Sequence, residues 1–189
     1  MLLKGPVDVA AVKGPERMET ARLVLRRPAA ADAEAIFSRY SSDPEVTRFL
    51  GWPMHRSLEQ TYAFLRFSDA EWQRWPAGPY LIEAKPAGAL LGGTGLAFET
   101  PFRAATGYVL ARDAWGAGYA SEALRAMVTL AADLRVRRLY ALCHPEHPAS
   151  QRVLERCEFA REGVLRRYVE FPNLQPGEPV DVLCYARVF

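Results

Sequence analysis

Apolar and polar positions along the chain follow two different periods, which predict a mixed α/β arrangement. Short alternating or continuously apolar runs predict strands at 20–27, 80–84, 90–98, 106–111, 138–144, 164–171 and 180–188. Apolar residues at helical spacing predict helices at 30–40, 57–74, 121–135 and 148–157. The order is one strand, two helices, three strands, a helix, a strand, a helix and two strands. It predicts a single mixed sheet of about seven strands with helices packed on it.

Turn-forming residues separate these elements. Lys85-Pro-Ala-Gly88 has the chemistry to join two strands as a hairpin. Ser42-Asp-Pro44 is expected to end the helix before it. Ser57-Leu-Glu-Gln60 matches a capping box, in which the Ser57 hydroxyl accepts from the backbone amide three residues on. Residues 49–55 are expected to form an aromatic loop, and residues 172–179, with three prolines, a loop between the last two strands.

The composition limits the class of protein. A length of 189 residues suits one domain, and the balance of 50% hydrophobic and 24% charged residues excludes disorder as the main state. No run approaches the roughly 18 apolar residues that a membrane span requires. The net charge of +2, without a long Lys/Arg tract, argues against a dedicated nucleic-acid binder.

The N-terminus and the cysteines bear on processing and compartment. Residues 1–17 lack the features of a signal peptide, so we expect a flexible lead-in followed by the domain at 18–189. The three cysteines, Cys143, Cys157 and Cys184, are too few for a disulfide framework. A reducing, cytoplasmic compartment fits this cysteine usage best.

One glycine turn carries the most specific chemistry. A predicted strand runs into Trp115-Gly-Ala-Gly118-Tyr-Ala120, and this turn opens the helix predicted at 121–135. The first turn of a helix has unpaired backbone amides and a partial positive charge. Because glycines have no side chain, an anion can approach those amides closely. A phosphate or pyrophosphate is the natural ligand, and a tight turn without any ligand is the alternative.

Three phosphate-binding motifs compete for this turn. A Walker loop needs Gly-Lys-Ser/Thr, which is absent. A dinucleotide fingerprint needs a third Gly or Ala where Ser121 stands, so that match fails. The third motif is the acyl-CoA loop of the GNAT acetyltransferases, Gln/Arg-x-x-Gly-x-Gly/Ala. Residues 115–120 match it except at the first position, which is Trp115.

On these residues and two further motifs, the chain resembles the GNAT superfamily and, within it, the RimJ/RimL-type N-acetyltransferases. That branch commonly has Trp-Gly-x-Gly-Tyr-Ala-x-Glu-Ala in the loop, which Trp115–Ala123 matches throughout. Its His-Pro-x-Asn-x-x-Ser stretch and the later Gly-Phe correspond to His144–Ser150 and to Glu158-Phe159. Its opening Thr-x-Arg-Leu-x-Leu-Arg corresponds to Thr20–Arg26.

The resemblance implies a fold and an activity. The fold has helices on both faces of the sheet and a splayed central pair, in which strands 106–111 and 138–144 are parallel neighbours joined by helix 121–135. The activity is transfer of an acetyl group from acetyl-CoA, a co-substrate, to a primary amine. The amine is expected on a protein N-terminus or a small molecule, and it attacks the thioester directly through a tetrahedral intermediate.

The resemblance also implies roles for individual residues. The expected acetyl-CoA contacts are the loop residues Trp115, Gly116, Ala117, Gly118, Tyr119 and Ala120, together with His147 and Ser150. The backbone amide of Val109 or Leu110 would serve the thioester oxygen. Many members use a Tyr as general acid where this chain has Leu154. RimL-type proteins are instead thought to use the Ser that matches Ser150, with a Glu that matches Glu170 as base.

The chain departs from the family pattern at two positions. His147 replaces the family Asn that helps to hold the cofactor arm, so that contact is expected to be weaker or reshaped. An imidazole can still donate or accept a hydrogen bond. Glu158 replaces a Gly near a helix end, where a left-handed backbone is easier for glycine.

Structural roles are the alternatives for several of these residues. Ser150 can stabilise a helix start, and Glu170 can be a solvated strand residue. Glu122 lies in a predicted first helical turn, where a carboxylate favours the helix dipole. Cys143 and His144 are neighbours on a predicted strand and should point to opposite faces, and there is no Cys-x-x-Cys pair. No metal site is therefore expected.

Two rival functions follow from the same residues. An aminoglycoside-type acetyltransferase would need an acidic cleft for its polycationic acceptor. A non-catalytic acyl-CoA-binding sensor is favoured by the loss of the Tyr acid and of the family Asn. In all cases we expect a monomer or homodimer without nucleic-acid or membrane partners.

Overall fold

The computed structural model describes residues 12–189, and within them eight strands form one sheet. The strands are β1 (Arg17–Glu19), β2 (Leu23–Arg26), β3 (Pro79–Ala84), β4 (Ala89–Thr100), β5 (Arg103–Leu110), β6 (Arg138–Cys143), β7 (Ala160–Phe171) and β8 (Gln175–Val188). Their order across the sheet is β1-β2-β3-β4-β5-β6-β8-β7. Every neighbouring pair is antiparallel except β5 and β6, which are parallel. The predicted mixed sheet is confirmed.

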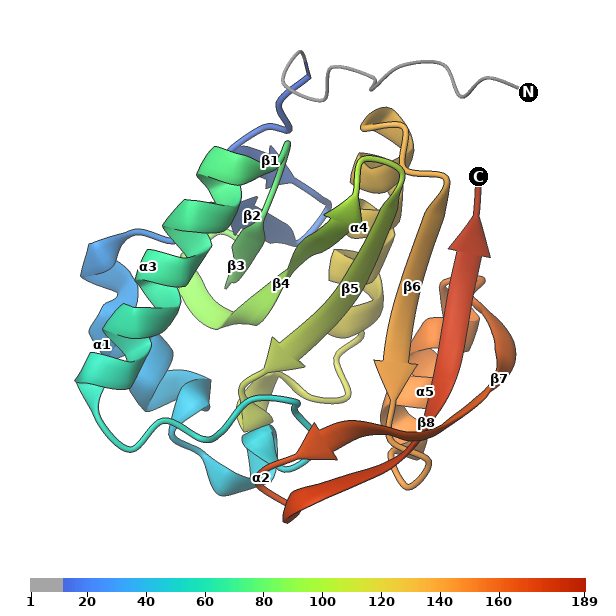
Figure 1. Ribbon diagram of the computed structural model, residues 1–189. Coiled ribbons are helices and arrows are strands. Elements are labelled where there is room, and N and C mark those ends of the chain that lie inside the picture. The colour runs from blue at the N-terminus through green and yellow to red at the C-terminus, as the bar shows by residue number, and fades with distance from the viewer. Residues whose placement is uncertain (1–11) are drawn as a thin grey trace.

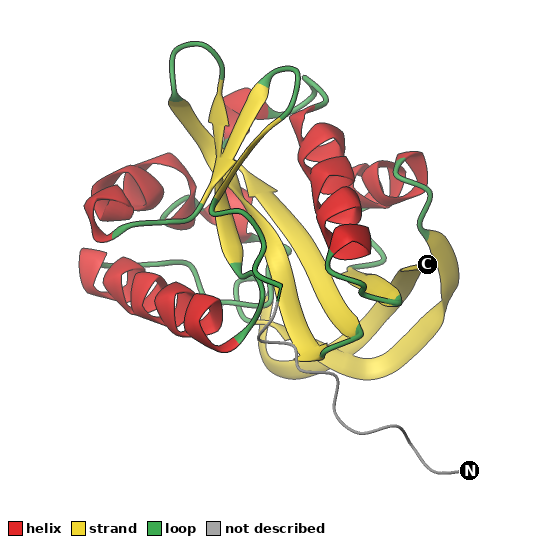
Figure 2. Ribbon diagram, turned by 90° about the horizontal axis from the view of Figure 1, so that it is seen from above, coloured by secondary structure: helices red, strands yellow, loops and turns green. Residues whose placement is uncertain are grey.

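Helices cover both faces of the sheet. They are α1 (Ala33–Ile36), α2 (Pro44–Thr47), α3 (Leu58–Arg74), α4 (Tyr119–Asp133) and α5 (Pro148–Arg156). In Figure 1, α1 and α3 lie in front of the sheet, and α4 and α5 lie behind it. Figure 2 shows the sheet between these two layers. The inner face of α4, including Leu124 and Met127, is fully buried in the core against the sheet.

The central parallel pair separates along its length. Arg103–Ala105 of β5 pair with Arg138–Tyr140 of β6, but no pairing follows beyond these three residues of each strand. β5 nevertheless continues to Leu110 and β6 to Cys143. The two strands therefore diverge towards their C-terminal ends, as the predicted splayed pair requires, and α4 connects them (Figure 1).

The sheet differs from the sequence prediction at both ends. The eighth strand, β1, has three residues, which is too short to display a period. The loop expected at 172–179 is mostly strand, because β8 already begins at Gln175. Pro176 and Pro179 are tolerated in β8 because this part of the strand lies beyond its pairing with β6. Only β7 is a neighbouring strand there.

The helical segment before α3 also differs from the prediction. Residues 30–41 form a 3-10 turn, α1 and then a π-helical turn at Phe37–Ser41, instead of one regular helix. Pro44 starts α2 as well as ending the preceding segment, because the Asp43 side chain accepts from the Glu45 amide at 2.9 Å and caps this short helix. The predicted Ser57 cap does not form. Gln60 Oε1 instead accepts from the Arg56 amide.

The described part of the lead-in contacts the domain. Lys13 Nζ donates to the Trp75 carbonyl at 2.9 Å, and the Gly14 amide donates to the Pro76 carbonyl at 2.8 Å. These bonds hold the segment beside the end of α3. Residues 1–11 of the predicted lead-in lie outside the described residues, and the boundary at residue 18 stays a prediction.

Candidate active site

The glycine turn lies where β5 leads into α4. A short 3-10 turn, Arg112–Ala114, follows β5, and α4 begins at Tyr119. Gly116 and Gly118 have φ angles of 76° and 82°, a left-handed conformation that favours glycine. Gly118 is the N-cap of α4, and no side chain caps this helix. The first amides of α4 therefore lack a capping partner, and an anion can approach them.

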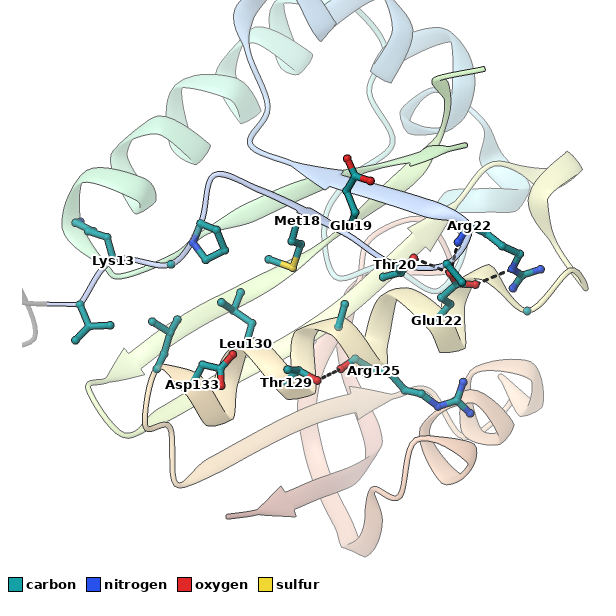
Figure 3. A pocket seen from close by; sticks show the side chains of 17 residues that line it. Lys13, Met18, Glu19, Thr20, Arg22, Glu122, Arg125, Thr129, Leu130 and Asp133 are labelled. Atoms are coloured by element: carbon teal, nitrogen blue, oxygen red, sulfur yellow. Dashed lines mark hydrogen bonds and ion pairs between the residues drawn. The ribbon is translucent and has the colours of Figure 1, made fainter. Parts of the chain in front are cut away.

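A cluster around Glu122 fixes the start of α4 to the β1–β2 turn (Figure 3). Thr20 Oγ1 and the Arg22 amide donate to Glu122 Oε1 at 2.6 and 2.8 Å. Arg22 Nε donates to Glu122 Oε2 at 2.7 Å, and Arg22 Nη1 donates to the Ala117 carbonyl at 2.9 Å. Burial alone would raise the pKa of Glu122, but the hydrogen bonds from Thr20 and Arg22 hold it below its ordinary value. Glu122 is thus a structural link between two sequence motifs.

A cavity of about 670 Å³ lies between residues 12–22 and the outer face of α4 (Figure 3). Its lining includes Lys13, Arg125 and Asp133, so charges of both signs surround it. Gly118 lies at its border. None of its lining residues also lines the larger cavity described next.

The larger cavity, about 770 Å³, passes through the sheet at the diverging strands. Tyr40 and Phe64 line it on the side of α1 and α3. Ser150 and Leu154 of α5 line it on the other side. Because α3 and α5 lie on opposite faces, the cavity connects the two faces through the gap between β5 and β6. A long, thin substrate arm can therefore enter from one face and meet a second substrate from the other.

The lining of this cavity is aromatic and uncharged. Among the described residues, no Asp, Glu, Lys or Arg lines it. Its phenyl, phenol and indole rings are Tyr40, Phe49, Trp52, Phe64, Phe67, Tyr80, Tyr108, Tyr140 and Phe171. Three imidazoles also line it: His55, His144 and His147. The acidic cleft that a polycationic acceptor needs is not present in this lining.

One backbone amide at the edge of β5 is available to a ligand. The Ala111 amide donates to the Leu91 carbonyl of β4 at 2.7 Å. Successive amides of a strand point to opposite edges, so the Leu110 amide points away from β4, towards the gap. The Leu110 carbonyl also points away from β4, because it accepts from Trp115 Nε1 at 2.8 Å. The amide and carbonyl of one strand residue point to the same edge, so this bond supports the orientation of the Leu110 amide. By the same alternation, the Val109 amide points towards β4.

Ser150 lies in the cavity and is bonded to a tyrosine that the sequence analysis did not single out. The Tyr108 and Ser150 hydroxyl oxygens are 2.8 Å apart, and the Tyr108 hydroxyl also lies 3.1 Å from the Ser150 carbonyl. Burial raises the pKa of Tyr108, against a smaller opposing effect of the Ser150 bond. Tyr108 therefore stays protonated and can orient Ser150. The available sequence signal for this contact was the position of Tyr108 in the strand that leads into the glycine turn.

The imidazoles near α5 form an aromatic cluster with Phe49. The Phe49 ring lies 5.0 Å from His144 and 4.7 Å from His147, centroid to centroid. His147 is the N-cap residue of α5 but makes no capping bond with its side chain. Burial lowers the pKa values of His55, His144 and His147. The rings are thus held in their neutral form around neutral pH.

Glu170 is not part of the cavity. On β7 the neighbouring Val169 and Phe171 line the cavity, whereas Glu170 is exposed. Its Oε1 accepts from the Gly177 amide at 2.8 Å. Because successive side chains of a strand point to opposite faces, the two cavity residues place Glu170 on the outer face. The structure brings Ser150 into the site and does not bring Glu170 there.

Asn173, in the turn between β7 and β8, holds the aromatic loop in place. Its Nδ2 donates to the Thr47 and Trp52 carbonyls, both at 2.8 Å, and its Oδ1 accepts from the Met54 amide at 2.7 Å. The residues joined by these three bonds are between 119 and 126 positions apart in the sequence. No local pattern signals such a contact.

Two departures from the family pattern have clear structural consequences. Glu158 has a φ of 63°, so it does adopt the left-handed conformation expected of a glycine. Arg187 Nη1 donates to the Glu158 carboxylate at 2.7 Å and to the Cys157 carbonyl at 3.1 Å, which stabilises this corner. Leu154 is buried in the cavity wall and offers no proton.

The cysteines do not form a site in the described residues. Cys143 and His144 both line the larger cavity, contrary to the expected opposite faces, because β6 ends at Cys143 and the strand alternation stops there. Burial raises the pKa of Cys143 and of Cys157, which disfavours the nucleophilic thiolate. Across residues 12–189 no group of three His, Cys, Asp or Glu side chains is placed to hold a metal ion. None of the described helices could span a membrane.

Comparisons with known proteins agree with this geometry. An uncharacterised N-acetyltransferase of Bacillus subtilis (strain 168), YoaA, is 34% identical over 174 residues, which cover 90% of this chain and 96% of YoaA. The solved structure of RimL, a ribosomal L7/L12 alpha-N-protein acetyltransferase in complex with coenzyme A, is 26% identical with a TM-score of 0.77. That match covers 90% of this chain and 96% of RimL.

A third similar protein supports the fold of the same branch. RimJ of Mycobacterium smegmatis has a TM-score of 0.75 at 23% identity, covering 88% of this chain and 81% of RimJ. The family described as Acetyltransferase (GNAT) domain matches residues 22–160, which include the glycine turn, both diverging strands and α5. The chain therefore belongs to the GNAT acetyltransferase family, with RimJ/RimL-type relatives, and is an acyltransferase.

Proposed function

We propose that the protein transfers the acetyl group of acetyl-CoA to a primary amine. The observation that carries this proposal is the cavity through the sheet, which lies between the diverging strands β5 and β6 and opens on the face of α3. Acetyl-CoA supplies an activated thioester when bound. The residues around the gap have the shape and the polar groups to receive its arm.

The start of α4 fits the pyrophosphate of acetyl-CoA. Gly116 and Gly118 leave room for the phosphates, and the amides of Ala117, Tyr119 and Ala120 are within the same turn. Trp115 contributes its backbone there, since its indole is bonded to Leu110. The coenzyme A complex of RimL is consistent with this role but concerns that protein.

Two groups in the gap are suited to the reaction itself. The Leu110 amide is proposed to donate to the thioester oxygen, where negative charge develops during attack. The amine forms the new C–N bond to give a tetrahedral intermediate, and the C–S bond then breaks. The Ser150 hydroxyl is proposed to give its proton to the departing sulfur and to regain a proton from solvent water. Tyr108 holds Ser150 in place for that step.

The proton that the amine loses needs a separate acceptor. The cavity lining contains no carboxylate among the described residues, so the base role expected of Glu170 has no geometric support. Water and the neutral imidazole of His55 are the acceptors on the α3 side. His55 Nδ1 is paired with Thr61 Oγ1 at 2.9 Å, which orients the ring.

A thiol-release assay with a panel of primary amines tests the proposal. We expect coenzyme A release that depends on the amine, with a product heavier than the amine by one acetyl group in mass spectrometry. Binding of acetyl-CoA without release in the presence of any amine would instead support the acyl-CoA sensor. Preferred turnover of aminoglycosides would support the aminoglycoside-type enzyme.

A further inference from the structure

The face of the cavity on the α3 side is built from three segments. They are the π-helical turn Phe37–Ser41, the aromatic loop 49–55 and α3. π-helical turns are rare and occur frequently at functional sites. Asn173 fixes the aromatic loop by three hydrogen bonds, so its rings are positioned before any ligand arrives. This face is therefore a preformed binding surface.

The rings of this surface suit a flat ligand. Phe49 and Trp52 are half-buried and line the cavity, so each presents part of its ring to the interior. Phe49 stacks on His147 with an interplanar angle of 19°, and Trp52 lies 5.3 Å from His55. Aromatic rings pair favourably with another ring in stacked or edge-to-face geometry. An aromatic ring in the ligand would pack against the parts of Phe49 and Trp52 that face the cavity.

The charge of the cavity restricts the ligand further. The described lining has no carboxylate and no Lys or Arg, and its imidazoles are held neutral by burial. A second cationic group would lose its hydration here without gaining a counter-charge. The surface thus disfavours any positive charge other than that of the reacting amine.

We propose that the acceptor is a small aromatic amine with no second positive charge. The inference rests on the proposed acetyl transfer. The cavity volume of about 770 Å³ also has to hold the acyl-bearing arm of acetyl-CoA. A volume in this range is typical of small-molecule sites, which favours a small molecule over a polypeptide N-terminus.

Four matched amines test the class of acceptor. Phenethylamine and 2-cyclohexylethylamine share size and charge but differ in aromaticity, whereas 1,4-diaminobutane adds a second charge and Ala-Gly-amide represents a peptide. We expect kcat/KM for phenethylamine to exceed that for the cyclohexyl analogue by about fivefold to tenfold. It should exceed that for diaminobutane by roughly 100-fold. Equal values, or a preference for diaminobutane or the peptide, would overturn the inference.

One variant locates the site of recognition. Trp52→Ala should raise KM for phenethylamine by about tenfold and change that for 2-cyclohexylethylamine less. An equal change in KM for both amines would remove Trp52 from the aromatic surface.

A binding measurement separates this inference from the proposed function. Phenethylamine and diaminobutane are titrated calorimetrically into the protein saturated with coenzyme A, where no transfer occurs. Tighter binding of phenethylamine without any acetyl transfer in the turnover assay would support the aromatic site and contradict the proposed reaction. Acetyl transfer without any preference for phenethylamine would contradict the aromatic site alone.

Discussion

The two ends of the proposed active site are built from different parts of the polypeptide. At the glycine turn, the available groups are backbone amides of one continuous segment, and Glu122 ties that segment to the β1–β2 turn. On the α3 side, the surface consists of side chains from the π-helical turn, loop 49–55 and α3. In the proposed function, the first end binds an anion through main-chain geometry, and the second binds an uncharged ring through packing. The structure of the first end is thus specified locally, whereas that of the second depends on tertiary contacts.

The largest expected effect concerns the glycine turn. Gly118→Asp places a carboxylate where the phosphates are proposed to bind, so acetyl-CoA affinity should fall by about 100-fold or more, measured by calorimetry. Gly118→Asn has the same shape and backbone demand without the charge, and should lose only about fivefold.

Gly88→Asp is the matched control for this variant. Gly88 lies in the β3–β4 turn with a φ of 70° and open space around it, so the substitution repeats the left-handed strain away from the site. Its acetyl-CoA affinity should equal that of the wild type. Equal affinities for Gly118→Asp and Gly88→Asp would exclude the glycine turn as the phosphate site.

The next effect distinguishes the residue inside the cavity from the one outside it. Ser150→Ala removes the proposed proton donor and should lower kcat by roughly tenfold to 100-fold, because water replaces the hydroxyl incompletely. Glu170→Gln should keep kcat within about twofold, since its carboxylate faces solvent. Steady-state kinetics at saturating amine measure both. A 100-fold loss in Glu170→Gln would restore Glu170 as the base and would require β7 to rearrange in the complex.

A smaller effect concerns the link between the two motifs. Glu122→Gln keeps the shape but removes the charge that accepts from Thr20 and Arg22, so the free energy of unfolding should fall by about 1–2 kcal/mol. Acetyl-CoA affinity should fall only a few-fold, as the α4 N-terminus loses its anchor. Urea denaturation and calorimetry measure the two quantities. Undiminished stability would mean that the bonds of Glu122 to Thr20 and Arg22 do not stabilise the fold.

The smallest effect is the pH dependence of the uncharged end. Burial depresses the pKa of His55 below its ordinary 6.5, so the unfolded chain binds more protons than the folded one just below that pH. This contribution to stability is complete above about pH 6.5 and is lost as the pH falls through the folded pKa. The melting temperature should fall by a few degrees between about pH 7 and pH 5. His55→Asn should flatten that decline, and an equally steep decline in the variant would exclude His55 as a contributor.

Much of the fold around the glycine turn could be predicted because its determinants are local. The order of strands and helices and the strand–glycine turn–helix arrangement followed from short segments, and the parallel pair β5 and β6 followed from the family resemblance. Glu122 could be placed in a first helical turn from the sequence. Its partners Thr20 and Arg22, however, are 102 and 100 positions away in the sequence. The contact therefore needed the structure.

The acceptor end was predicted less well because its determinants are distant in sequence. The π-helical turn at Phe37–Ser41 replaces a helix that looked regular, since apolar spacing does not distinguish turns of slightly different pitch. The contacts of Asn173 with loop 49–55 join segments far apart along the chain. The outward orientation of Glu170 depends on the register of β7, which a single strand pattern does not fix.

Two-substrate kinetics of Gly118→Asn and Trp52→Ala test the division of the site most directly. We expect Gly118→Asn to raise KM for acetyl-CoA about fivefold and to leave KM for phenethylamine unchanged. Trp52→Ala should show the reverse, with about a tenfold increase in KM for phenethylamine alone. If each variant changes both KM values equally, the two ends are not separate binding surfaces and the account is contradicted.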